Sequence, residues 1–281
     1  MVESAHEQSV NSVVSEDGTR ISYLTTGSGP DVIVVPGVLS VARGYGRFAE
    51  ALGTGFTVHT IERRGRGESG PQRADHGVEA DCADLRAVQD KTGAGLVVGH
   101  SYGGFVTLEA ARRNSGLRKV AVYEPGLSVN GSMPTGWMGA YEKYLAQGKP
   151  FDAFVEFVRE LGPESARRIP RWMFRRMMPL FMNAPERDVV IAQLPQNLVE
   201  HRQYVRYDST HEHYSEIGAE VLLIDGGRDR RAWTASDQEL LASVIPQCER
   251  ATIPDLDHFG IDKGDPERVA GIVREFFLRG L

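Results

Sequence analysis

The sequence has few cysteines, no long apolar run and no excess of basic residues. Its two cysteines, Cys82 and Cys248, fall in a helical pattern and beside a strand pattern, which predicts two reduced, partly buried thiols. No cysteine–histidine cluster has the spacing of zinc ligands. No apolar stretch reaches the roughly 18 residues of a transmembrane helix, and the N-terminus lacks the basic and apolar regions of a signal peptide. We therefore expect a cytoplasmic protein with no structural metal and no membrane anchor.

The charge balance excludes another class of partner. The formal net charge is -6 and the pI is about 5.8, which argues against nucleic acid or an anionic membrane as the main partner. The 281 residues are 41% hydrophobic, enough for one large core of the α/β type. The oligomeric state does not follow from these numbers.

Strand and helix patterns alternate along the first part of the chain. A hairpin with a turn at Glu16–Gly18 comes first, and short, continuous apolar runs then alternate with helical spacings. The expected buried strands cover residues 31–37, 56–62, 95–100, 118–126, 220–227 and 248–254. Such alternation predicts an α/β fold with a doubly wound, mostly parallel, eight-stranded sheet.

The alternation stops between residues 127 and 217, where only helical patterns occur. We interpret this segment as an inserted helical cap or lid, with residues 1–126 and 218–281 forming the core. Methionines and aromatic residues gather in the segment and would either line an apolar pocket or pack the lid. Its arginines would either bind a substrate carboxylate or the phosphate of a carrier protein, or form a solvated helix face: Arg167, Arg168, Arg171, Arg175 and Arg176.

The stretch Gly99-His100-Ser101-Tyr102-Gly103 matches G-x-S-x-G between a buried strand and a helix. This is the setting of a nucleophile elbow, in which the serine adopts strained backbone angles. Side chains at the positions two before and two after the serine would clash, which explains the glycines. The sequence predicts that Ser101 is a nucleophile at the N-terminus of the helix.

A serine needs a base, and the base needs an orienting carboxylate. His258 follows the last expected strand, and the C-terminal ends of parallel strands share one edge of the sheet. Asp229, just after strand 220–227, is the first choice for the acid. Glu124 competes with it, because it ends the strand after the elbow helix. Asp225 would lie within a strand end and be less free to reach the histidine.

An oxyanion hole completes the expected site. One donor would be the backbone N–H of Tyr102, and the other the backbone N–H of Val38 in the loop after strand 31–37. Gly37 would allow the backbone to approach the reacting carbonyl closely.

Together these segments resemble the α/β-hydrolase fold superfamily with a helical cap. The matching pieces are "VVPGVLS", "IERRGRGES", "VVGHSYGG", "LLIDGGRD" and "PDLDHFG", in this order. The resemblance implies the triad Ser101, Asp229 and His258, and no metal or organic cofactor. Pro36-Gly37 replaces the His-Gly of many relatives, and Glu62 replaces a frequent Asp.

The expected activity is that of a serine hydrolase that cleaves a carboxylic ester of a hydrophobic small molecule through an acyl-enzyme on Ser101. A thioesterase-like or C–C-bond hydrolase, such as a tailoring enzyme of secondary metabolism, is the first alternative. The second is a ligand receptor on the same fold. An aspartate-nucleophile reaction is disfavoured by the serine at position 101.

Overall fold

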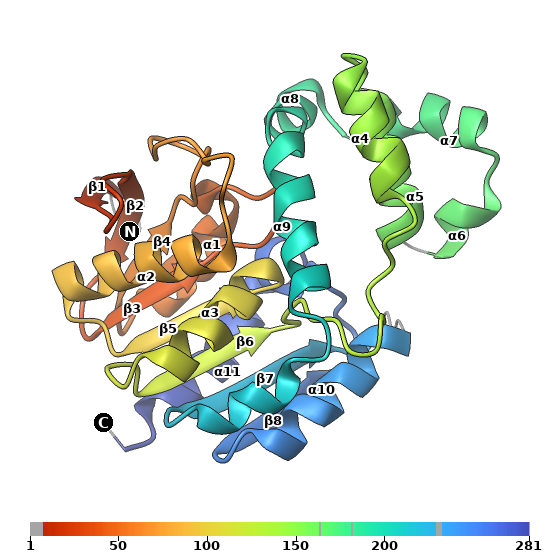
Figure 1. Cartoon of the computed structure of the whole chain (residues 1–281). Helices are drawn as coiled ribbons and strands as arrows, with labels where there is room; N and C mark the ends of the chain where they lie inside the picture. Colours follow the sequence, from red (N-terminus) through yellow and green to blue (C-terminus); the bar gives the residue numbers. More distant parts are fainter. Residues whose placement is uncertain (1–7, 163, 181, 229–231, 281) are drawn as a thin grey trace, which may run out of the picture.

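One eight-stranded sheet organises the chain (Figure 1). The computed structural model describes residues 8–162, 164–180, 182–228 and 232–280. The strands are β1 (Ser9–Val14), β2 (Arg20–Gly27), β3 (Asp31–Val35), β4 (Thr57–Ile61), β5 (Leu96–His100), β6 (Lys119–Tyr123), β7 (Glu220–Gly226) and β8 (Cys248–Ile253).

The strands lie in the order β1-β2-β4-β3-β5-β6-β7-β8. From β4 to β8 all neighbours are parallel, whereas β2 is antiparallel to both β1 and β4. The mostly parallel, eight-stranded sheet expected from the sequence is confirmed. Its parallel part brings the C-terminal ends of β3, β5, β6, β7 and β8 to one edge.

Helices cover both faces of the sheet, which is why its central strands read as continuous apolar runs. All five residues of β5 are buried. Val97 packs in a cluster with Leu85 and Phe105, whereas Val98 packs on the opposite face in a cluster with Phe48 and Phe276. The alternation of neighbouring side chains between two cores fixes the register of the strand.

The flanking helices come from both halves of the chain. They are α1 (Gly46–Leu52), α2 (Val78–Thr92), α3 (Tyr102–Arg113), α10 (Ala232–Val244) and α11 (Pro266–Leu278), with the short helices η1 (Ala42–Tyr45) and η4 (Gly260–Gly264). Gly93 follows the last residue of α2, and its φ of 76° forms a left-handed C-cap.

The described part of the segment between β6 and β7 consists of helices and connecting loops and contains no strand. It contains α4 (Met138–Ala146), α5 (Pro150–Leu161), α6 (Glu164–Arg168), α7 (Arg171–Met177), η2 (Met178–Leu180), α8 (Ala184–Ala192), α9 (Leu194–Arg206) and η3 (His211–Glu216). In Figure 1, α4 to α8 stand together, apart from the helices that flank the sheet. Their function as a lid stays a prediction.

Many apolar side chains of this segment pack against one another. Trp137, Tyr141, Phe154 and Met178 belong to one buried cluster, with Trp137 and Tyr141 in edge-to-face contact at 5.0 Å between centroids. Among the described helices, none combines the length and the apolar character needed to cross a membrane.

Candidate active site

Ser101 lies between β5 and α3 with φ 54° and ψ −121°, strained angles for a residue with a side chain. A Cβ added to Gly99 would come within 2.4 Å of the Thr107 Oγ1 atom, and one on Gly103 within 2.0 Å of the Val35 carbonyl oxygen. The steric reason for the two glycines is thus confirmed. The turn has the form of a nucleophile elbow.

Strained residues gather at the same edge of the sheet. Leu39 (φ 51°), Ser101 and Glu124 (φ 41°) follow β3, β5 and β6, which are adjacent strands. Positive φ in residues other than glycine carries a cost of about 1–3 kcal/mol and clusters at functional sites. This clustering marks the edge as the candidate site.

His258 and Glu124 meet at this edge. The Nδ1 atom of His258 lies 2.7 Å from Oε2 of Glu124, while Oε1 of Glu124 accepts a hydrogen bond from the Gly226 N–H at 3.0 Å. The carboxylate is buried, and both of its oxygens have partners. Asp229, the first choice from the sequence, lies outside the described residues, so the contact with His258 is described for Glu124 alone.

A hydrogen-bonded chain holds the backbone of the His258 loop. The carbonyl oxygen of His258 can only accept, so the His100 Nε2 at 2.9 Å must donate to it. The Nδ1 atom of His100 therefore accepts from the Tyr45 hydroxyl at 2.6 Å, and that hydroxyl accepts from the Gly37 N–H at 3.0 Å. Burial lowers the pKa of His100 well below its usual range, which keeps the imidazole neutral. His100 thus links the His258 loop to the loop after β3.

The two backbone amides expected in the oxyanion hole border Ser101. Tyr102 is the first residue of α3, where backbone N–H groups have no partner within the helix. Val38 follows Gly37, and a Cβ added to Gly37 would lie 3.1 Å from the Cβ of Ser101. Their function as donors stays a proposal.

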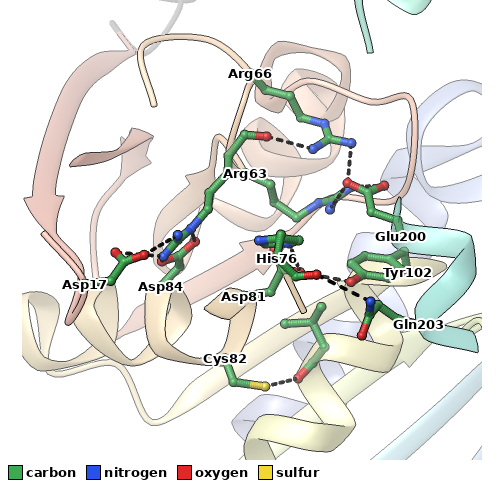
Figure 2. A network of polar contacts seen from close by, with 12 residues as sticks. Asp17, Arg63, Arg66, His76, Asp81, Cys82, Asp84, Tyr102, Glu200 and Gln203 are labelled. Atoms are coloured by element: carbon green, nitrogen blue, oxygen red, sulfur yellow. Dashed lines mark hydrogen bonds and ion pairs between the residues drawn. The ribbon is translucent and has the colours of Figure 1, made fainter. Parts of the chain in front are cut away.

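A buried ionic network joins the loop after β4 to helix α9 (Figure 2). Arg63 and Arg66, from the loop after β4, both bind Oε1 of Glu200 on α9 at 2.7 Å. Burial alone would raise the pKa of the Glu200 carboxyl, but the two guanidinium groups lower it below its usual value. Sequence reasoning missed this contact, because no local pattern links residues so far apart.

Helix α9 also reaches the loop after β6. A Cβ added to Gly126 would lie 2.1 Å from the hydroxyl oxygen of Tyr204, so this position tolerates only glycine beside that side chain. The Gly126 N–H donates to the Ser101 carbonyl oxygen at 2.9 Å. The helical segment therefore contacts the candidate site directly.

The arginines of the helical segment are partly paired within it. Arg171 binds Glu156 and Asp152 at 2.5 and 2.9 Å, and Arg175 binds Asp152 at 2.9 Å. The neighbouring carboxylates compensate the positive charges of Arg171 and Arg175 locally, which disfavours a function of these two residues in binding an acidic group of a substrate.

Within the described ranges, no group of three or more His, Cys, Asp or Glu side chains is placed to hold a metal ion.

Asp262, on η4, provides a pH-dependent prediction. Burial raises its pKa to about 6, although Lys263 and His258 partly oppose the rise. The unfolded carboxyl ionises from about pH 4, whereas the folded one stays protonated up to about pH 6, so the free energy of unfolding falls across this window and levels off above it. We expect Asp262→Asn to raise that free energy by about 3 kcal/mol at pH 8, with the gain vanishing near pH 3.

Urea denaturation across this pH range measures the effect, with Glu50→Gln, an exposed carboxyl, as the control. A gain from Asp262→Asn that is independent of pH would contradict the raised pKa.

Comparison with known proteins places the chain in a family. A family model described as "Alpha/beta hydrolase family" matches residues 32–272. The chain belongs to the alpha/beta hydrolase family. This alpha/beta hydrolase is similar to the N-formylmaleamate deformylase of Pseudomonas putida, with 36% identity over 121 residues. That match covers 41% of this chain and 45% of the relative, so the chain spans less than half the length of the curated relative it matches.

Solved structures share the fold. An alpha/beta hydrolase from Sphaerobacter thermophilus superposes with a TM-score of 0.80 at 30% identity, covering 95% of this chain and all of that one. The N-formylmaleamic acid deformylase of Pseudomonas putida S16 superposes with a TM-score of 0.67 at 20% identity, covering 94% of this chain and 100% of that one. Family membership supports a hydrolase activity for this alpha/beta hydrolase.

Proposed function

We propose that this alpha/beta hydrolase is a serine hydrolase in which Ser101 is the nucleophile, His258 the general base and Glu124 the orienting acid. The hydrogen bond from His258 to Glu124, at the edge where Ser101 occupies a strained elbow, is the observation that supports this proposal. A buried carboxylate on Nδ1 fixes the tautomer in which Nε2 is free to accept a proton, and it stabilises the imidazolium that forms.

The chemistry follows from these positions. The Ser101 oxygen attacks the substrate carbonyl while His258 takes the hydroxyl proton, and the carbonyl oxygen gains negative charge. The Val38 and Tyr102 amides donate to that oxygen. His258 then protonates the leaving group, an acyl-enzyme remains on Ser101, and water activated by His258 releases the acid.

The proposed substrate is a carboxylic ester of a hydrophobic small molecule. The apolar side chains of residues 127–217, proposed here as a cap, support an apolar substrate. Thioester or C–C-bond hydrolysis uses the same nucleophile and stays an alternative, as does a receptor without catalysis. Cytoplasmic location also stays a prediction.

A second candidate reaction has a specific observation in its favour. The similar relative is named a deformylase of N-formylmaleamate, which is an N-acyl compound and not an ester. Ser101 with two amide donors would serve attack on an N-formyl carbonyl equally well.

A substrate panel separates these reactions. We expect wild-type protein to hydrolyse p-nitrophenyl butyrate and Ser101→Ala to lose at least about a thousand-fold in kcat/KM. Thr107→Ser, which keeps a hydroxyl near the elbow, is the matched control. Turnover of N-formylmaleamate or of a butyryl thioester, with little on the ester, would select the corresponding alternative. Folded protein that turns over none of them would contradict the catalytic proposal.

A further inference from the structure

The peptide group between Gly37 and Val38 is held from outside the proposed triad. The Gly37 carbonyl oxygen accepts a hydrogen bond from Nη2 of Arg63 at 2.7 Å. In a trans peptide the C=O and N–H groups point in opposite directions, so a fixed Gly37 carbonyl also fixes the direction of the Val38 N–H. Gly37 packs against Ser101, which places this peptide beside the nucleophile.

Arg63 is itself fixed by the helical segment. Its Nη1 and Nη2 atoms donate to Glu200 at 2.7 and 3.2 Å, and the two side chains are 2% and 0% exposed. The guanidinium also lies over the ring of Tyr102, 4.9 Å from its centroid. Figure 2 shows Arg63 between Glu200 and Tyr102. The Arg63 guanidinium thus contacts both the loop that carries the Val38 N–H and the side chain of Tyr102, whose backbone N–H is the second proposed donor.

Arg66 provides an internal comparison. It binds the same Glu200 oxygen at 2.7 Å and is as buried as Arg63, but its other partners are Gln193 and the Arg64 carbonyl. Arg66 therefore shares the ionic network without holding the Gly37 carbonyl.

We propose that Arg63, held by Glu200 of α9, is a positioning residue that directs the Val38 N–H toward the reacting carbonyl oxygen of the substrate. The inference rests on the proposed serine hydrolase mechanism. It couples the position of α9 to the geometry of the oxyanion hole: a displaced Glu200 would release Arg63, and Arg63 would release the peptide. The substrate-facing amide would then depend on correct docking of the helical segment onto the core.

Arg63→Lys and Arg66→Lys test the assignment as a matched pair. Lysine keeps the positive charge but lacks the planar fork that serves Glu200 and Gly37 together. With p-nitrophenyl butyrate, we expect Arg63→Lys to lower kcat by about 30- to 100-fold with KM changed less than about threefold, since an oxyanion donor acts on the transition state. Arg66→Lys should lose stability to a similar extent but keep kcat within about threefold.

Inhibition by phenethyl trifluoromethyl ketone supplies a second readout. Its adduct with Ser101 carries an oxyanion, so its Ki should rise in Arg63→Lys by about the same factor as kcat falls, and stay unchanged in Arg66→Lys. If Arg63→Lys does not fold, Glu200→Asp replaces it, because the shorter side chain retains the charge and displaces Arg63; kcat and Ki should then change in the same directions.

Equal losses of kcat in the two lysine variants, or an unchanged Ki in Arg63→Lys, would overturn the positioning assignment while leaving the proposed function intact. Wild-type protein without turnover and without labelling by a fluorophosphonate would instead overturn the proposed function, and this inference with it.

Discussion

Replacing Glu124 by glutamine should lower kcat by about four orders of magnitude, because an amide at this position no longer fixes the productive tautomer of His258 or stabilises its charged form. The expectation follows from the 2.7 Å contact between the carboxylate and Nδ1 of His258. The Gly226 N–H donates to the other carboxylate oxygen. The side-chain amide oxygen of glutamine can still accept this hydrogen bond, so the fold should survive the change. Steady-state kinetics on p-nitrophenyl butyrate, with circular dichroism to confirm folding, measures the effect.

Asp229→Asn is the control that the sequence itself provides. If Glu124 is the acid, Asp229→Asn should change kcat by less than about tenfold. The reverse result, a large loss in Asp229→Asn and a small one in Glu124→Gln, would restore the order of choice made from the sequence and contradict the account of Glu124.

Glu200→Gln should lower the free energy of unfolding by about 3–5 kcal/mol, since it leaves two buried guanidinium groups without the carboxylate that forms ion pairs with both of them. Arg63, Arg66 and Glu200 are all at most 2% exposed, so water cannot replace the lost carboxylate. The lowered pKa of Glu200 means that the wild-type contribution is present above the unfolded pKa of about 4.5 and disappears as pH falls through the folded value. Urea denaturation at pH 7 and pH 4 measures both effects.

Glu142→Gln is the matched control for this measurement. Glu142 pairs with Arg202 at 2.9 Å on the same helical segment, but both side chains are at least half exposed. Its removal should cost less than about 1 kcal/mol. Comparable losses in Glu142→Gln and Glu200→Gln would show that burial of the network contributes little.

Local sequence was sufficient for most of the fold and for the elbow. The buried strands and the glycines at positions 99 and 103 follow from rules that act within a few residues, such as continuous apolar runs and Cβ clashes. The same rules located His258 at a strand end, because parallel strands share one edge.

The acid required tertiary information. Glu124 and Asp229 both follow strands that end at this edge, and their sequence positions alone do not determine which one reaches His258. What favours Glu124 is its own backbone: a φ of 41° just after β6, together with the Gly226 amide, positions the carboxylate. The sequence gives no sign of that angle.

The buried ionic network of Arg63, Arg66 and Glu200 was not predictable from the sequence. Arg63 and Glu200 are 137 residues apart, and no sequence pattern singles out either side chain. His100 is neutral and has a hydrogen bond at each ring nitrogen, which makes it unsuited to act as a base, and it links the His258 loop to Tyr45. Such functions depend on contacts between distant segments.

The most direct test of the central claim is the mass of wild-type protein quenched with acid during turnover of p-nitrophenyl butyrate. The account predicts a population heavier by one butyryl group, with the modification on the peptide that contains Ser101, and its absence in Ser101→Ala. Turnover by Ser101→Ala at the wild-type rate, or an acyl group on another residue, would contradict the assignment of Ser101 as the nucleophile.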